Sequence, residues 1–245
     1  MSKLIKWSLV AALAGFLFGF DTVVISGADQ KLQELWNSSD IFHGSVVMAM
    51  ALWGTVFGAI FGGIPTRKYG RRNTLIWIGI FYSISAVGSA LANDPITFAV
   101  FRFIGGVGVG VSGIAAPAYI SEIAPAKNRG KLVGFYQFNL VTGILVAFLS
   151  NYLLSGIGEN DWRYMMGVEA IPAILYTLLV LSIPKSPRWL YLNNQKDKAE
   201  KIIRDAYSKN DADELIIEIT RDKESNVESE SIFQKKYSFI LTLAF

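Results

Sequence analysis

Four long stretches of the chain contain no Asp, Glu, Lys or Arg. They are residues 44–66, 73–93, 103–121 and 132–158, and two more apolar stretches, 7–28 and 163–183, are interrupted only by isolated charges. An apolar helix of about 20 residues is long enough to cross the hydrocarbon core of a bilayer. Because a transmembrane β-barrel would instead show alternating segments of about 10 residues, the pattern predicts an all-α integral membrane protein with six spans.

Three charged residues lie inside these expected spans: Asp21 in the first, Arg102 in the fourth and Glu169 in the sixth. A charge at the centre of a membrane helix costs at least about 2.5–3.5 kcal/mol. Such residues are therefore rare, usually face the interior of a bundle, and mark functional sites. Their mixed sign predicts a polar pathway through a helical bundle.

The composition gives no sign of an enzyme. The chain is 52% hydrophobic, 18% charged and free of cysteine, which excludes disulfides and thiolate metal sites. The sequence has no evident cluster of metal ligands and no nucleophile–base pair. Its GxGxxG pattern at 108–113 lies inside an apolar span, whereas a dinucleotide fold needs a preceding strand. We therefore expect no catalytic or metal site, no cofactor and no nucleic-acid partner.

Positive charge is concentrated in alternate loops. Lys3 and Lys6 precede the first span, and the second-to-third and fourth-to-fifth loops carry further Lys and Arg, whereas the loops at 29–43, 93–95 and 155–162 are poor in both. Because Lys and Arg favour the cytoplasmic side, we expect a multi-pass protein of the cell inner (plasma) membrane with a cytoplasmic N-terminus. The tryptophans near span ends predict an interfacial belt: Trp7, Trp36, Trp162 and Trp189.

The character of the chain changes after Pro184. Residues 1–183 hold the six spans, and residues 184–236 are highly charged, with an amphipathic helix expected at 197–207. Residues 237–245 are apolar again, but as a helix they would span only about 13 Å. We therefore expect a transmembrane bundle, a cytoplasmic helical loop and the start of a truncated seventh span.

Glycine recurs at helical spacing in three spans. The glycines concerned are Gly15 and Gly19, then Gly54, Gly58 and Gly62, then Gly106 and Gly110. In lipid, small residues let helix backbones approach and gain van der Waals contact. The spacing predicts close helix crossings, and the same faces are candidates for sliding during a conformational cycle.

Four sequence motifs lie at the ends of the expected spans. They are FGFDT with ISGA (18–22, 25–28); GxxxRKYGRR (63–72); RxxxGVGVG with PAYISEIAP and RG (102–110, 117–125, 129–130); and WRYM with PKSPRWL (162–165, 184–190). Together, and in this order, they resemble the sugar porter family of the major facilitator superfamily. Among sugar porters the chain most resembles the bacterial D-xylose–proton symporters.

The resemblance implies a fold and an activity. It covers nearly the whole chain but only the first half of the family's twelve-helix fold, so it implies an N-terminal six-helix bundle whose C-terminal half is missing. It implies transport of a monosaccharide such as D-xylose by alternating access, with a proton as coupling ion and the lipid bilayer as surroundings. Two alternatives remain: a passive sugar facilitator, or a truncated, transport-inactive membrane fragment or interaction protein.

The resemblance also implies the proton site. Asp21 is the expected proton carrier and Arg102 its partner. Glu169 is a second partner for Arg102 when Asp21 is protonated. The alternative is a static buried ion pair that only fixes how the helices are aligned.

Phe18 and Gln137 match sugar-contacting positions of the family. An amide can donate to and accept from neighbouring hydroxyls, and an aromatic ring can pack on the apolar face of a sugar. The alternatives are an interhelical hydrogen bond for Gln137 and simple packing for Phe18. Ile144 stands where the xylose symporters carry a second glutamine, which loosens the assignment to xylose.

The resemblance places an inner gate at the cytoplasmic ends of the spans. The residues implied to form its ion pairs are Arg71, Glu122, Arg129 and Arg188, and topology-setting charge is the alternative. Arg67 and Lys185 depart from the family, which usually carries acidic residues at these two positions. These two reversals argue against the family's usual network of ion pairs at this gate, and a locally rewired set is the alternative.

Overall fold

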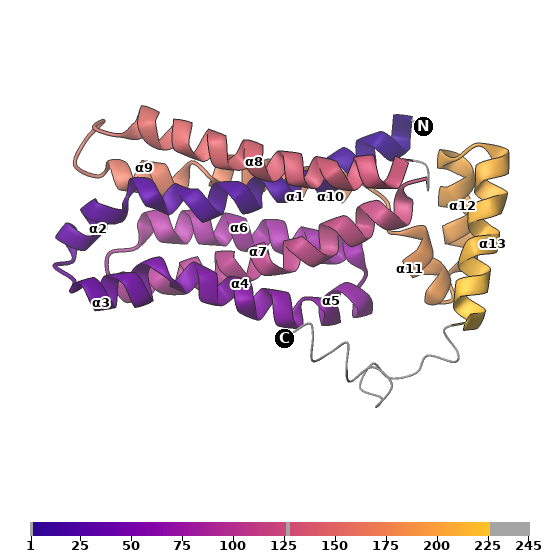
Figure 1. The fold of residues 1–245 in the computed structure, drawn as a ribbon, viewed down its shortest axis with the longest axis horizontal. Coiled ribbons are helices and arrows are strands. Elements are labelled where there is room, and N and C mark those ends of the chain that lie inside the picture. The colour runs from indigo at the N-terminus through magenta and orange to yellow at the C-terminus, as the bar shows by residue number, and fades with distance from the viewer. Residues whose placement is uncertain (1, 126–127, 226–245) are drawn as a thin grey trace.

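The computed structural model describes residues 2–125 and 128–225, and each regular element within these ranges is a helix (Figure 1). Six helical stretches are long and apolar enough to cross a membrane: Lys3–Gly27, Asp40–Phe61, Arg71–Leu91, Pro95–Ile123, Arg129–Leu154 and Asp161–Ser182. This finding confirms the six predicted spans. The seventh span expected at 237–245, and residues 226–236 of the charged loop, lie outside the described residues.

Four of the spans are continuous helices. They are α1 (Ser2–Val24), which continues into the short 3₁₀ turn η1 (Ile25–Gly27), α6 (Arg71–Leu91), α7 (Pro95–Ile123) and α8 (Arg129–Leu154). The start of α7 follows from its sequence. The side chain of Asp94 accepts hydrogen bonds from the backbone N–H groups of Ile96 and Thr97 at 3.1 and 2.9 Å. Pro95 follows as the first helical residue, where its missing N–H does no harm.

The second span contains an irregular turn. It consists of α3 (Asp40–Phe42), the π-helical turn η2 (His43–Met48) and α4 (Met50–Phe61), and α5 (Gly63–Lys68) follows it. The short helix α2 (Asp29–Leu35) precedes it at one end of the bundle, and we name this end the α2 end (Figure 1).

The sixth span is broken into α9 (Asp161–Gly167) and α10 (Ala170–Ser182). Proline lacks the N–H that would bond to the carbonyl four residues earlier. For Pro172 that carbonyl belongs to Val168, where the chain leaves the helix. The N–H of Ile171 bonds to the Val168 carbonyl instead, at 3.2 Å. The break places Glu169 directly before α10.

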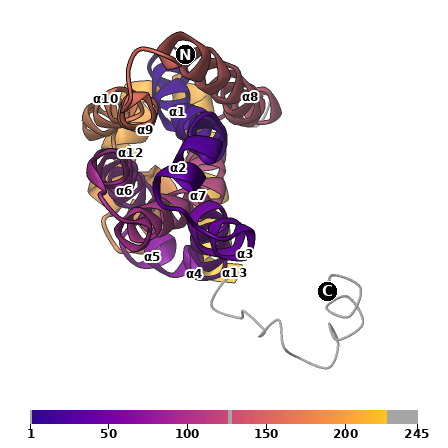
Figure 2. The same ribbon diagram turned by 90° about the vertical axis from the view of Figure 1, so that its left-hand side faces the viewer.

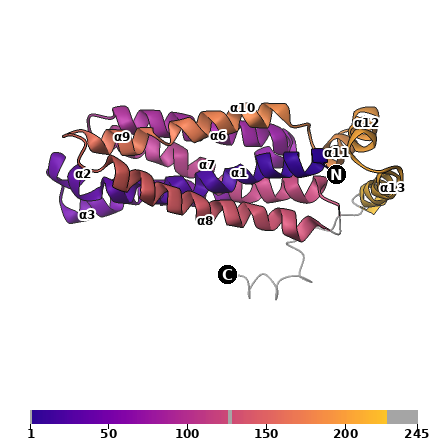
Figure 3. The same cartoon turned by 90° about the horizontal axis from the view of Figure 1, so that it is seen from above.

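Helices α1 and α7 lie at the centre of the bundle and α4 and α8 at opposite margins (Figure 2). Helices α6 and α10 run along one side, with α8 along the other (Figure 3). In the most apolar stretch of each span, 61% of residues are buried for the first and fourth spans but only 22% for the second and fifth. Helices α4 and α8 therefore present the most uncovered surface.

Glycine sets the two closest helix crossings. A Cβ added to Gly19 of α1 would lie 2.0 Å from the carbonyl oxygen of Leu140 in α8, and one on Gly106 of α7 would lie 2.0 Å from that of Ala51 in α4. The same crossings bring the following glycines against a facing backbone: Gly15, Gly54, Gly58, Gly110 and Gly143. The predicted close crossings are confirmed. Within each crossing the two helices run in the same direction, and the α4–α7 pair runs opposite to the α1–α8 pair.

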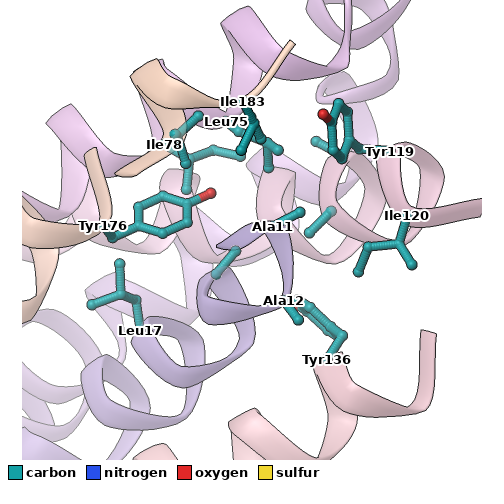
Figure 4. Close-up of a cluster of buried hydrophobic side chains, with 14 of the residues drawn as sticks. Ala11, Ala12, Leu17, Leu75, Ile78, Tyr119, Ile120, Tyr136, Tyr176 and Ile183 are labelled. Atoms are coloured by element: carbon teal, nitrogen blue, oxygen red, sulfur yellow. The ribbon is translucent and has the colours of Figure 1, made fainter. Parts of the chain in front are cut away.

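Two apolar clusters fill the bundle. One contains Leu17, Ile78 and Tyr176, whose side chains converge between α1, α6 and α10 in Figure 4. The other, nearer the α2 end, includes Phe98 and Trp162. Trp162 is 2% exposed and packs edge-on against Trp36 and Phe98. The predicted interfacial position of Trp162 is therefore wrong.

Three helices lie across the end of the bundle opposite α2: α11 (Pro187–Leu192), α12 (Lys196–Ala206) and α13 (Lys209–Ser225) (Figure 1). Helix α12 confirms the predicted amphipathic helix, and its apolar face packs in a separate cluster with Trp189. Trp189 is buried rather than interfacial, as its indole covers Gly70. Gly70 has φ +86°, and an added Cβ there would meet the indole at 2.9 Å, so glycine suits this turn on both counts.

We expect Gly106→Ala to lower the stability of the bundle by about 1–3 kcal/mol, because the methyl group would meet the Ala51 backbone. Gly134→Ala in α8 is the matched control. A Cβ at Gly134 meets no atom within 4 Å, and alanine is the better helix former, so this variant should match or exceed the parent. Thermal unfolding of both variants in detergent micelles checks the expectation, and equal stability of the two would contradict it.

Candidate functional site

Asp21 and Arg102 form a buried ion pair between the two central helices. Nη1 of Arg102 donates to Oδ1 of Asp21 at 2.5 Å, and Nη2 donates to the backbone carbonyl oxygen of Asp21 at 2.9 Å. Each residue is 1% exposed. Hydrogen bonds between two charged groups are the stronger kind, so this pair joins α1 to α7 firmly.

Glu169 lies beside this pair and interacts electrostatically with both of its members. It is 1% exposed, and neither of its carboxylate oxygens has a hydrogen-bond partner among the described residues. The break between α9 and α10 accounts for its position. At the start of α10, the positive end of the helix dipole favours a negative charge.

Five of the buried polar residues of α1, α6, α7 and the α9–α10 break lie near the level where the two apolar clusters meet. We name this set the polar layer, and its members are Asp21, Ser85, Ser89, Arg102 and Glu169. In α1, for example, Leu17 belongs to one apolar cluster and Phe20 to the other, with Asp21 next to Phe20. Apolar residues of both clusters therefore flank Asp21 along α1.

The polar layer holds two carboxyl groups and one guanidinium group. With both carboxyl groups ionised, the site would carry an unpaired negative charge, and burying such a charge is costly. One proton shared by Asp21 and Glu169 removes that charge and supplies a donor for an unbonded carboxylate oxygen. The arrangement is therefore suited to holding and releasing one proton.

A pocket of about 280 Å³ reaches the ion pair from one side. It lies between α1, η2, α4 and α7, and Asp21, Arg102 and Thr55 are among the residues that line it. Phe18 and Gln137 lie elsewhere, on the α1–α8 crossing. Phe18 is partly buried against the apolar cluster and Gln137 is exposed on α8. Because Gly15 contacts the carbonyl of Tyr136 there, these two residues lie within about one helical turn of each other along the bundle.

The candidate gate residues fall into separate contacts. Arg71 pairs with Glu122 at 2.7 Å, and the hydroxyl of Ser186 donates to the other carboxylate oxygen of Glu122 at 2.5 Å. Arg188 pairs with Glu218 of α13 at 2.9 Å. The described structure thus joins only two of the four candidates to each other.

Arg129 lies in a pocket of about 90 Å³ that is also lined by Tyr207 and Glu214. Tyr207 donates its hydroxyl hydrogen to the backbone carbonyl of Ile123 at the end of α7. Burial raises the pKa of Tyr207, so this hydroxyl keeps its proton. The contact ties α12 to the end of α7.

Sequence reasoning missed Ser186 and Glu218. The Ser186-Pro187 pair is a signal for the start of a helix, and Ser186 does cap α11 by accepting from the N–H of Trp189 at 3.2 Å. Nothing local in the sequence indicates that its hydroxyl also binds Glu122.

Residues 67 and 185 both contact Trp189, Arg67 through its backbone carbonyl and Lys185 through its ammonium group. The indole N–H of Trp189 donates to the backbone carbonyl of Arg67 at 2.8 Å. The ammonium of Lys185 lies 5.2 Å from the centre of the same ring. A cation over an indole face is an attractive contact, so both positions help to seat α11 against the bundle.

Comparison with known proteins gives a consistent result. The family model described as "Sugar (and other) transporter" matches residues 7–243. The D-xylose-proton symporter of Escherichia coli K12 is 37% identical over 234 residues, which cover 83% of this chain and 48% of that protein. The glucose transport protein of Synechocystis is 40% identical over 205 residues, covering 79% of this chain and 44% of that protein.

Among solved structures, the proton:xylose symporter XylE bound to 6-bromo-6-deoxy-D-glucose superposes with a TM-score of 0.86 at 35% identity. The match covers 91% of this chain and 54% of that one, in its N-terminal half. The chain therefore spans about half the length of the curated relatives it matches.

We expect Arg102→Met to lower the free energy of unfolding by about 3–5 kcal/mol, because it leaves buried carboxyl groups without their cation. The double variant Asp21→Leu with Arg102→Met should recover much of that loss, since it removes both members of the pair. Arg204→Met is the control. Arg204 pairs with Asp213 at 3.5 Å, and both side chains are more than half exposed, so the loss should stay below about 1 kcal/mol. Unfolding in detergent checks the series. A double variant that is less stable than the Arg102→Met variant would contradict the expectation.

Proposed function

The chain belongs to the sugar transporter family, whose members are transporters rather than enzymes, and on this premise we propose that it acts as the N-terminal half of a proton-coupled monosaccharide symporter. The observation that carries the proposal is the buried Asp21–Arg102 pair with Glu169 beside it. A passive pore for a neutral sugar has no need of three buried ionisable groups, each of which is costly in a membrane.

Asp21 is the proposed proton carrier. When it takes up a proton, its charge-assisted bond to Arg102 becomes a weaker bond to a neutral group. Arg102 then turns toward Glu169, which interacts electrostatically with it already. Because Asp21 belongs to α1 and Glu169 lies at the α9–α10 break, the exchange of partners changes which helices the guanidinium holds together. That change is the proposed link between protonation and alternating access.

Phe18 and Gln137 are the proposed sugar contacts on this half. The exposed amide of Gln137 faces away from the packed core and is free to bond sugar hydroxyls, and the ring of Phe18 offers an apolar face. The uncovered surfaces of α4 and α8 support the proposal that a second six-helix half packs alongside. The sugar-binding site would lie between the two halves.

The proposed orientation puts the N-terminus and α11–α13 in the cytoplasm of a cell whose inner (plasma) membrane holds the protein. Lysine and arginine in the loops at that end support it. In this orientation the Arg71–Glu122–Ser186 and Arg188–Glu218 contacts lie at the cytoplasmic end, where they are the proposed inner gate. The domain division proposed is a bundle at 1–183, a cytoplasmic segment at 184–236 and the start of another span at 237–245.

A second candidate function follows from the coverage of the relatives. Since the chain spans about half of their length, the 245 residues by themselves would have no closed pathway. Alone they would be inactive in transport, and at most an interaction partner for further residues that supply the other half. Passive facilitation is the remaining alternative within the family.

The test uses two proteins in liposomes: the 245-residue chain alone, and the same chain joined to the C-terminal half of the E. coli D-xylose–proton symporter. We expect the joined protein to accumulate D-xylose when the outside is made acidic, and the chain alone to transport nothing. Asp21→Asn in the joined protein should abolish accumulation but keep exchange of labelled for unlabelled sugar, because only proton uptake is lost.

Asp197→Asn is the matched control, since Asp197 is an exposed carboxylate on α12, far from the polar layer along the chain. It should accumulate D-xylose as the parent does. Equilibration without accumulation in the parent would favour the passive facilitator. Unchanged acid-driven accumulation in the Asp21 variant would remove Asp21 from the proton pathway.

A further inference from the structure

Helix α6 carries two buried serines whose hydroxyls have no partner among the described residues. Ser85 is 1% exposed and Ser89 is 0% exposed. Neither hydroxyl oxygen has a hydrogen-bond partner in that part of the chain. The two residues are four positions apart, so they lie on one face of α6, one turn after the other. Buried hydroxyls are normally hydrogen-bonded, so this pair calls for a ligand.

Two other side chains of α6 bond their hydroxyls to the backbone, whereas the hydroxyl of Tyr82, like those of the two serines, has no partner among the described residues. Ser83 donates to the carbonyl of Gly79 at 2.8 Å, and Thr74 donates to that of Gly70 at 3.1 Å. This bond to the carbonyl four residues earlier is the ordinary solution for a hydroxyl inside a helix. Ser85 and Ser89 do not adopt it, although the same solution is open to them.

Ser85 lies next to the proton site, and Ser89 lies one helical turn beyond it on α6. A Cβ added to Gly105 would lie 2.3 Å from Oγ of Ser85 and 3.3 Å from Oδ1 of Asp21, so the two oxygens border the same space. Glu169 is placed by the antiparallel packing of the sixth span on α6. Gly167 faces Ala90 and Tyr176 faces Gly79, so Glu169 lies alongside the segment of α6 that carries Ser85 and Ser89.

The row of polar groups continues to the α2 end of the bundle. Just past the end of α6 at Leu91, the exposed side chain of Asn93 accepts a hydrogen bond from Nη2 of Arg163 at 3.0 Å. Side chains one helical turn apart are separated by about 5–6 Å, which is too far for a direct hydrogen bond but fits one bridging water. Polar groups thus occur at the Asp21 level, one helical turn further on at Ser89, and beyond the end of α6 at the surface.

We propose that Ser85 and Ser89 bind a short chain of water molecules that connects the Asp21–Glu169 carboxyl pair to the aqueous phase at the α2 end. The proposal rests on the proposed function, because it supplies the route by which the coupling proton reaches its carrier. Each water accepts a proton on one side and gives up another on the other side, so charge moves without displacement of heavy atoms. The ligand of the site is water, held by hydroxyl and carboxyl groups.

This route is separate from the pocket that reaches the ion pair. That pocket is lined by residues of α1, η2, α4 and α7, and by none of α6 among the described residues. The serines approach the carboxyl pair from α6, which lies on a different side of α7 from α4 (Figure 2). The proposed water route and this pocket would therefore reach the polar layer from different sides.

Small residues on a membrane helix also allow close packing, and alanine would serve that purpose equally well. The test is therefore Ser85→Ala with Ser89→Ala, with Ser83→Ala as the matched control on the same helix. The 245-residue chain in lipid nanodiscs is moved into deuterium oxide, and infrared spectroscopy follows the carbonyl band of the buried protonated carboxyl group. Asp21→Asn and Glu169→Gln assign that band.

We expect the double variant to slow deuterium exchange of the band by about tenfold or more, because the bridging waters lose hydrogen-bond partners. Ser83→Ala should exchange as the parent does. Unchanged exchange in the double variant overturns the water route and leaves the proton carrier intact. A parent chain with no protonated carboxyl band contradicts the proposed function itself. Each single variant, Ser85→Ala or Ser89→Ala, decides the question in the same way if the double variant does not fold.

Discussion

The ion pair between Asp21 and Arg102 constrains the rest of the bundle. Because the guanidinium binds both the side chain and the backbone of Asp21, α1 and α7 must lie side by side at one fixed level. The glycine crossings then attach α8 to α1 and α4 to α7. Helices α6, α9 and α10 complete the enclosure, which keeps the charges from lipid. The cost of a charge in hydrocarbon is thus what makes the central contact specific.

The central features of the fold could be predicted from the sequence because each has a strong local cause. Charges in apolar stretches must find partners, so Asp21 and Arg102 stand out from their spans by charge alone. Glycines four residues apart share a helix face, and in lipid such a face allows a second helix to approach closely. Charge-free stretches of sufficient length leave little choice but a membrane helix. These causes act within one turn or one span, which is why sequence reasoning reaches them.

The details that sequence reasoning missed depend on segments far apart in the chain. A tryptophan near a span end faces lipid or the interior according to its neighbours, and Trp162 meets Trp36 and Phe98 inside. Ser186 indicates the start of a helix, but the carboxylate to which its hydroxyl donates, that of Glu122, belongs to α7. Glu218 lies in α13, where the charged, amphipathic pattern does not single out any one carboxylate. The break before α10 was also missed, although Pro172 is its direct local cause.

The two glycine crossings have a consequence for how the protein is made. Each joins two helices that run in the same direction, and the two pairs run in opposite directions. These contacts are internal to the bundle, so they stay the same when the whole bundle is turned over in the membrane. Packing energy therefore gives the cell little information about which way to insert the chain. The loops must carry that instruction, as lysine and arginine at one end do. Surface charges that add almost nothing to stability thus decide which end of the bundle faces the cytoplasm.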